Sequence, residues 1–184
     1  MKDNPLIHRP TTAPDYPRWT ESLRDRQQVL IRPITKLDLQ AEREFIESLS
    51  ALSRRYRFLG QIRTPSEKML ERFTDIDYVH EVAFVATVMH DGRERIVGVS
   101  RYCTDEPGES CECAVTVSDE WQDKGLGTLL MKHLIEVARA RGIRTMSSID
   151  SAENMKMKDL AKHLGFHARV DPDNASQVIH ELEL

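Results

Sequence analysis

A short polar segment between an apolar strand and an apolar helix has the residue types of an anion-binding loop. The β-branched run at residues 115–117 is typical of the end of a buried strand, and an apolar helical pattern starts at Leu126. Gly125 and Gly127 lie at the join, where the lack of a Cβ atom lets backbone N–H groups approach an anion. The positive end of the helix dipole adds to this attraction. The segment predicts a phosphate-binding turn, although two glycines alone also suit an ordinary strand-to-helix turn.

A carboxylate interrupts the apolar segment that precedes this loop. Glu112 lies within the run Cys-Glu-Cys-Ala-Val at residues 111–115. A carboxylate in a buried strand is unfavourable unless it is paired, hydrated or functional. Partial burial raises the pKa of a carboxylic acid towards values that suit a general base. Glu112 is therefore a candidate base, and the alternative is a surface glutamate or a structural ion pair.

The cysteines indicate neither a disulfide framework nor a metal site. Cys111 and Cys113 are too close in sequence for an ordinary disulfide, and one Cys-x-Cys lacks the second ligand pair of a closed zinc site. A cysteine nucleophile would need a base, but nothing local brings His133 or His163 to these thiols. We expect two small core residues with reduced thiols and no metal, and the role of Cys103 stays open.

The remaining pattern places strands and helices around the loop. The first helix has Thr35 as its N-cap and Leu37 in its apolar stripe, and residues 150–153 open the last helix. A strand-helix-strand-helix order around the loop suggests an α/β crossover with the ligand at the strand carboxyl ends. Strands are expected at 18–23, 28–32, 81–89, 96–102, 109–117, 143–149, 166–170 and 177–182, and helices at 35–49, 50–59, 65–73 and 126–138, besides the last one.

Length and composition favour one soluble domain. The chain has 184 residues, of which 40% are hydrophobic and 30% are charged, enough to bury a substantial core. Residues 1–17 hold four of the eight prolines and suggest an extended or disordered lead-in, so we expect the domain to span 18–184. Apolar runs fall well short of the ~20 residues of a membrane span, and the first residues do not resemble a signal peptide. We therefore expect a cytoplasmic protein.

Charge is distributed unevenly along the chain. The net charge is −4, yet residues 122–169 carry nine Lys or Arg against five Asp or Glu, which leaves −8 elsewhere. A basic half suits an anionic ligand and an acidic remainder suits a cationic partner, while general nucleic-acid binding is disfavoured. Solvated helix faces would give the same pattern. Arg54, Arg55 and Arg57 form another cationic cluster, which we interpret as a solvated helix face.

Two landmarks together resemble the GCN5-related N-acetyltransferases. The segment from Gln122 to Gly127 matches that family's Gln-x-x-Gly-x-Gly pyrophosphate loop, and Asn154 matches the Asn of the family's Asn-bearing helix, which ends in Leu-Gly-Phe at 164–166. The resemblance implies a three-layer α/β fold with a mixed sheet, helices on both faces, and acetyl-coenzyme A as co-substrate. It places the pantetheine arm along Val115 and Val117 and gives Asn154 a polar contact to the cofactor. The pyrophosphate would be held by backbone N–H groups of Gln122, Asp123, Lys124, Gly125, Leu126, Gly127 and Thr128.

A narrower resemblance is to the acetyltransferase domain of bacterial protein lysine acetyltransferases. It is carried by Leu-Ile-Arg-Pro-Ile at 30–34, Ser-Leu-Ser at 48–50, Tyr-Arg-Phe-Leu-Gly at 56–60 and Glu-x-Ala-Val-x-Val from Glu112. It implies that Glu112 deprotonates a primary amine, which attacks the thioester without a covalent enzyme intermediate. The implied acceptor is a protein lysine, with neither nucleic acid nor membrane as partner.

One position departs from the family pattern. Many members have a Tyr four residues before the Gly of Leu-Gly-Phe, where it protonates the leaving thiolate, but Ala161 stands there in this chain. The resemblance therefore leaves the general acid open. Two other functions also remain: acetylation of a small amine such as a polyamine, amino acid or drug, and a non-catalytic sensor of acyl-coenzyme A. Oligomeric state and regulation are not predicted.

Overall fold

The computed structural model describes residues 16–60, 64–105 and 108–184, and these residues form one mixed eight-stranded sheet. The strand order is β1-β2-β3-β4-β5-β6-β8-β7, and every neighbouring pair is antiparallel except β5 and β6, which are parallel. The strands are β1 Trp19–Ser22, β2 Gln28–Pro33, β3 Glu81–His90, β4 Arg93–Thr104, β5 Ser110–Val117, β6 Thr145–Ser151, β7 His167–Val170 and β8 Gln177–Glu183.

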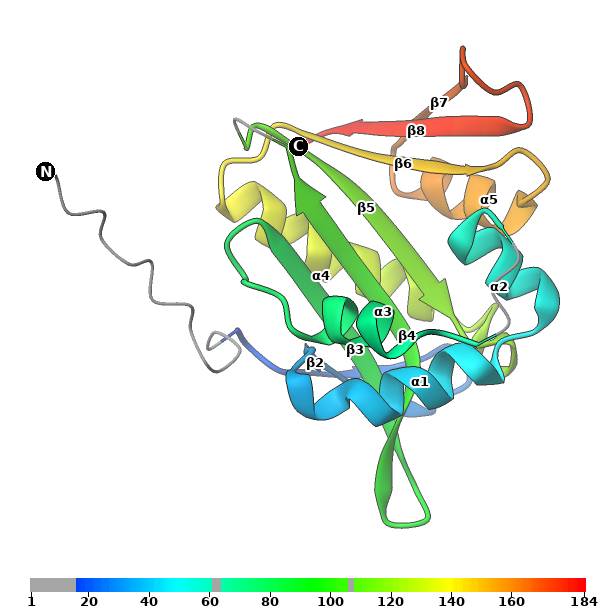
Figure 1. The fold of residues 1–184 in the computed structure, drawn as a ribbon. Coiled ribbons are helices and arrows are strands. Elements are labelled where there is room, and N and C mark those ends of the chain that lie inside the picture. The colour runs from blue at the N-terminus through cyan, green and yellow to red at the C-terminus, as the bar shows by residue number, and fades with distance from the viewer. Residues whose placement is uncertain (1–15, 61–63, 106–107) are drawn as a thin grey trace, which may run out of the picture.

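Helices cover both faces of the sheet, as expected for a three-layer α/β fold. Figure 1 shows α1 and α3 in front of the strands and α4 behind them, with α2 and α5 at the side where β5 and β6 diverge. Each face has its own cluster of buried apolar side chains. The helices are α1 Leu39–Ser48, α2 Ala51–Phe58, α3 Glu67–Thr74, α4 Leu126–Ala140 and α5 Met155–His163, with 3-10 turns η1 Lys36–Asp38 and η2 Asp119–Trp121.

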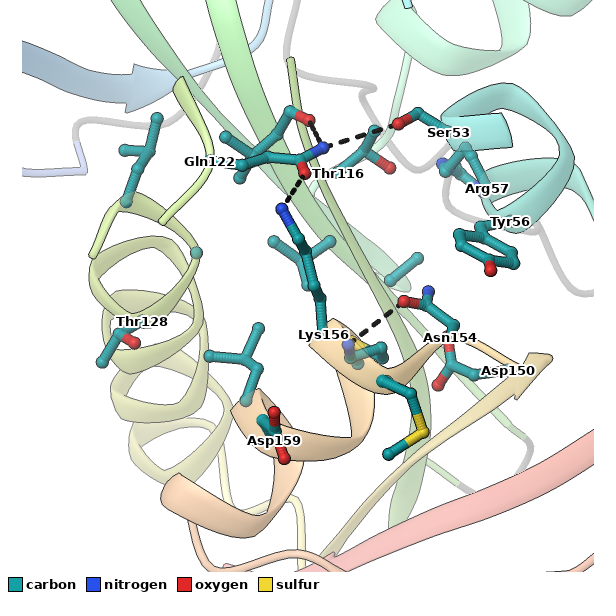
Figure 2. Close-up of a pocket in the computed structure, with 18 of the residues that line it drawn as sticks. Ser53, Tyr56, Arg57, Thr116, Gln122, Thr128, Asp150, Asn154, Lys156 and Asp159 are labelled. Atoms are coloured by element: carbon teal, nitrogen blue, oxygen red, sulfur yellow. Dashed lines mark hydrogen bonds between the residues drawn. The ribbon is translucent and has the colours of Figure 1, made fainter. Parts of the chain in front are cut away.

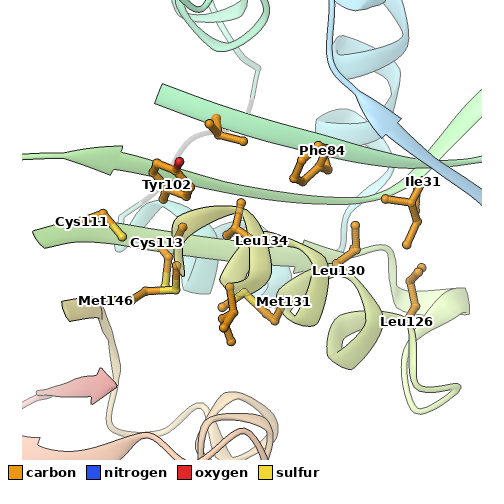
Figure 3. Close-up of a cluster of buried hydrophobic side chains, with 14 of the residues drawn as sticks. Ile31, Phe84, Tyr102, Cys111, Cys113, Leu126, Leu130, Met131, Leu134 and Met146 are labelled. Atoms are coloured by element: carbon orange, nitrogen blue, oxygen red, sulfur yellow. The ribbon is translucent and has the colours of Figure 1, made fainter. Parts of the chain in front are cut away.

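The larger core lies between the sheet and α4 (Figure 3). Leu130 and Leu134 of α4 are fully buried there, and fully burying such a side chain stabilises the fold by about 1.5–3 kcal/mol. The helix approaches β4 closely, because a Cβ atom on Gly98 would stand 2.8 Å from Leu130 Cδ1. Cys111 and Cys113 are buried in this core, as the sequence predicted, whereas Cys103 is exposed.

The start of the first helix differs from the prediction. Leu37, expected in the apolar stripe, is 95% exposed because it lies in η1, ahead of α1. Thr35 still caps this turn in a capping box with Asp38. Asp38 is itself buried, and its carboxylate pairs with the Arg32 guanidinium at 2.8 Å. Glu42 of α1 is also buried.

Two predicted boundaries change: that of the N-terminal lead-in and that of the last helix. The lead-in expected at residues 1–17 lies outside the described residues except for Tyr16 and Pro17, and the Tyr16 ring packs against Tyr78 and Phe84. Residues 150–153 do not open the last helix, since Asp150 still belongs to β6 and Asn154 is the N-cap of α5. In the described ranges, no helix is both long and apolar enough to cross a membrane.

Candidate active site

A cleft opens where β5 and β6 separate. These strands pair in parallel only at Ser110 with Thr145, Cys111 with Met146 and Glu112 with Ser147. Beyond Glu112, β5 stays paired with β4 on its other side. The β6-facing edge of residues 113–117 is therefore available to an extended ligand, which can pair with it like an added strand. The cavity at this fork has a volume of about 1070 Å³.

The loop before α4 has the backbone geometry of an anion site. Asp123 and Gly125 both adopt left-handed conformations, with φ of 60° and 90°. The Leu129 N–H makes the first bond of the helix, to the Gly125 carbonyl at 3.2 Å. The N–H groups just before it therefore have no carbonyl one turn earlier in the helix, and they point out of its positive end. A phosphate is the ligand that such a concave set of donors accepts.

The structure brings most of the sequence-predicted site residues to this one cavity. Lys124 is the exception: it does not line the cavity, and its ammonium contacts Asp25 at 2.9 Å and Gln27 at 2.7 Å. Gly127 has a second task besides leaving room for a ligand, because a Cβ there would meet Leu160 of α5 at 3.3 Å. The predicted residues that do line the cavity are Glu112, Val115, Val117, Gln122, Asp123, Gly125, Leu126, Gly127, Thr128 and Asn154.

Glu112 lines the cavity, but the reason given for it from the sequence is wrong. Its side chain is exposed, while Cys111 and Cys113 on either side are buried. Alternation along the strand explains the difference, since the cysteines point to the core under α4 and Glu112 points to the opposite face. Glu112 is the last β5 residue paired with β6. An exposed carboxylate at the fork can accept a proton without the cost of burial.

Arg57 is not on a solvated helix face, contrary to the sequence interpretation. It lines the cavity, and its guanidinium lies over the rings of Phe58 and Phe73, at 5.1 and 5.5 Å from their centroids. Burial, together with the nearby Arg101 cation, lowers the pKa of Arg57 to about 10. Behind it, Glu42 Oε1 lies 3.8 Å from Arg101 Nη2. The cleft therefore has a fixed cation on its α2 side.

Polar side chains tie the loop to α2 and α5. The Gln122 amide donates to the Val117 carbonyl at 3.1 Å, and the Lys156 ammonium donates to Gln122 Oε1 at 2.9 Å (Figure 2). Asn154, expected to contact a cofactor, accepts the Met157 N–H at 3.2 Å and so caps α5. A cap in this position fixes the helix end that borders the cleft.

Sequence reasoning missed one cation beside the loop. Arg24, in the turn between β1 and β2, lines the cavity, and its backbone N–H donates to the Lys124 carbonyl at 3.0 Å. Its Nε lies 3.5 Å from where a Cβ of Gly125 would stand. Among the described residues, its guanidinium forms no ion pair. Arg24 is about a hundred residues from the loop in the sequence, so no local pattern connects it with the loop.

Comparison with known proteins identifies the family. Residues 46–166 match the family described as the acetyltransferase (GNAT) family. Acetyltransferase PA5475 of Pseudomonas aeruginosa is 50% identical over 166 residues, which are 90% of this chain and 89% of that protein. The chain belongs to the GNAT acetyltransferases. Acetyl-coenzyme A is therefore its co-substrate, and the enzyme is an acetyltransferase that acts on an amine.

Solved structures and a second relative agree with this GNAT assignment. The GNAT domain of S. lividans PAT superposes with a TM-score of 0.84 at 29% identity, covering 92% of this chain and all of that one. Acetyltransferase Pat of Mycolicibacterium smegmatis is 28% identical over 111 residues, which are 60% of this chain and 33% of Pat. The acetyltransferase is thus similar to the GNAT domains of Pat proteins.

The cleft suits the chemical groups of acetyl-coenzyme A. The pyrophosphate matches the helix N-terminus, and the amide-bearing pantetheine arm matches the open edge of β5. Thr116 Oγ1, on a residue that lines the cavity, is a buried polar atom without a hydrogen-bond partner among the described residues. Buried polar groups of this kind are normally satisfied, which is consistent with a polar ligand there.

Proposed function

We propose that this GNAT enzyme transfers the acetyl group of acetyl-coenzyme A to lysine side chains of proteins, with Glu112 as the general base. The observation that carries the proposal is the position of Glu112, at the fork where the thioester end of a β5-bound pantetheine would arrive. An ammonium ion has no lone pair for attack on a carbonyl carbon, so a proton acceptor is needed there. The neutral amine then attacks the thioester directly.

A protein acceptor is supported by similarity and by the shape of the cleft. The narrow resemblance to lysine acetyltransferases agrees with the 29% identity to the S. lividans PAT domain. The α2 side of the cleft is lined by exposed apolar side chains, including Leu52 and Leu59, which a polypeptide around a lysine can cover. We also propose a cytoplasmic location, because Cys103, Cys111 and Cys113 are all free thiols.

The first test compares two carboxylates that line the same cavity. Glu112→Gln keeps the shape but cannot accept a proton, so turnover should fall by about 10²- to 10⁴-fold with unchanged affinity for acetyl-coenzyme A. The deficit should shrink at high pH, where more of the amine is already neutral. Asp159→Asn, also at the cavity, is the matched control and should leave turnover nearly unchanged. Equal losses in both variants would remove the specific role of Glu112.

The second test identifies the acceptor. Proteins, lysine peptides and free amines are compared by kcat/KM, and binding of acetyl-coenzyme A is measured in parallel. Protein or peptide acceptors should be preferred, and their rate should fall with salt because exposed charges are screened over about 10 Å at 0.1 M. A free amine that outperforms every peptide would replace the lysine proposal with the small-amine function. Cofactor binding without any turnover would indicate an acyl-coenzyme A sensor.

A further inference from the structure

Besides Glu112 of β5, the neighbouring strand β6 contributes a carboxylate to the cleft. Asp150 lines the cavity, and its side chain is 17% exposed. The Ser148 hydroxyl donates to Asp150 Oδ2 at 2.7 Å, and His180 Nε2 of β8 lies 3.9 Å from the same oxygen. Figure 2 shows Asp150 at the end of its strand next to Asn154. The proposed transfer of the acetyl group to an amine uses none of these three groups.

Strand register places the two carboxylates on opposite faces of the sheet. Cys111 pairs with Met146 and Glu112 with Ser147, so alternation puts Asp150 and Met146 on the face covered by α4. Glu112 projects from the other face. The two carboxylates therefore border the fork from opposite sides. A thioester lying between the strands would have one acid–base group on each side of its carbonyl carbon.

On the face covered by α4 and α5, a proton donor for the leaving thiolate has still to be identified. Ala161 of α5 is buried on that side and carries no proton donor. Cys113 borders the cavity there, but burial raises the pKa of its thiol well above the usual value. Such a thiol cannot readily give its proton to another thiolate. Asp150 is the carboxyl group on this side that is held close to a second proton carrier, His180.

We propose that Asp150 protonates the departing thiolate of coenzyme A, with Ser148 positioning its carboxyl group and His180 returning the proton. The inference rests on the proposed amine acetylation. As the tetrahedral intermediate collapses, the C–S bond breaks and its electron pair stays on sulfur, which takes the proton of the Asp150 carboxyl group. Glu112 holds the first proton of the ammonium, and the nitrogen releases its second proton to solvent as the amide forms. The products are the amide and free coenzyme A. Solvent protons restore Asp150 through His180.

The surroundings shift the Asp150 carboxyl group towards its protonated form. Burial raises the pKa of Asp150, while the Ser148 hydrogen bond and the nearby His180 and Arg57 lower it less. Burial lowers the pKa of His180, against the opposing effect of Asp150 and with a further contribution from Lys158. His180 is therefore neutral at pH 7, and its buried Nδ1 has no partner among the described residues. Activity that depends on protonated Asp150 should fall as pH rises through its pKa.

The deciding experiment varies the leaving group. Asp150→Asn keeps size and polarity but has no acidic proton, so single-turnover transfer from acetyl-coenzyme A should slow by about 10²-fold, with unchanged cofactor affinity. With the acetyl selenoester of coenzyme A as donor, the same variant should lose far less of its rate, because a selenolate is a much weaker base than a thiolate and leaves without a proton. His163→Gln, which removes a cavity-lining imidazole of α5, is the control and should affect both donors equally or not at all.

Each alternative outcome is distinguishable. An equal loss of rate with the thioester and the selenoester would overturn the proton-donor role and indicate that Asp150 has a structural role. An unchanged rate with the thioester would show that Asp150 has no role in the reaction. If Asp150→Asn does not fold, Ser148→Ala removes only the 2.7 Å bond and should give a smaller loss that again depends on the donor. These assays use whichever amine the wild type acetylates fastest. A wrong acceptor class would therefore appear in the acceptor panel described above, and the comparison of thioester with selenoester would still be valid. Glu112→Gln should slow both donors.

Discussion

Two helices border the same cleft and are attached to the protein in different ways. α4 has six buried side chains, Leu126, Leu130, Met131, Leu134, Ile135 and Ala138. α2, which the structure describes in full, has none. It is held by polar contacts, from Ser50 and Ser53 to Asp119 and from the Tyr56 hydroxyl to the Glu153 carbonyl at 3.3 Å, and by the stacking of its last residue, Phe58, on Phe73. The loop that precedes α4, at the cofactor end of the cleft, is thus anchored by the core. α2, on the side of the proposed acceptor, is attached mainly by contacts near the surface.

The largest expected difference is in stability. Leu130→Ala should lower the free energy of unfolding by about 2–5 kcal/mol, because it leaves a cavity between α4 and β4. Leu52→Ala on α2, where the side chain is 53% exposed, should change it by no more than about 0.5 kcal/mol. Urea denaturation of both variants measures this. Similar losses would contradict the view that only α4 is anchored by the core.

The second difference is in cofactor affinity. Arg24→Gln should weaken acetyl-coenzyme A binding by about 10- to 100-fold, the value of a hydrogen bond to a charged group, without changing KM for the acceptor. Because Arg24 lies over Gly125, dephospho-acetyl-coenzyme A, which keeps the pyrophosphate, should show the same loss. A loss confined to the full cofactor would move Arg24 to the ribose phosphate. Arg26→Gln, in the same turn but away from the cavity, is the calorimetric control.

The smallest expected effect concerns the attachment of α2 at acid pH. Burial alone would raise the pKa of Asp119, but hydrogen bonds from Ser50 and Ser53 outweigh it and hold the pKa below its usual value. The attachment is therefore complete above the unfolded pKa of about 3.9 and is lost as pH falls through the lower folded pKa. Asp119→Asn should remove this dependence at a cost of about 1 kcal/mol or less, since the site is exposed. An NMR titration of the α2 amides, with the α4 amides as reference, measures this detachment of α2 at acid pH. Identical acid transitions in the wild type and in Asp119→Asn would contradict the prediction.

The sequence predicted the parts of the site whose environment is local. The loop and the apolar pattern of α4 are set by residues within a few turns of one another, whereas the capping role of Asn154 was not predicted. Glu42, Arg57 and Asp150 could not be predicted, because their surroundings come from afar. Arg101 reaches Glu42, Phe73 reaches Arg57, and His180 reaches Asp150 only after the sheet has formed. Glu112 was singled out partly by an expected burial that the alternation along β5 does not give it, and its motif does not specify burial.

The short parallel pairing of β5 with β6 also bears on how the chain folds. Strands β1–β5 and strands β6–β8 form two antiparallel sets, and the two sets meet in the sheet at only three residue pairs. Three parallel pairs contribute little to holding the sets together, and the junction also requires the crossover through α4 to be in place. We expect this junction to form late and to open first in native-state hydrogen exchange. The substrate cleft then lies at the boundary between two cooperative folding units.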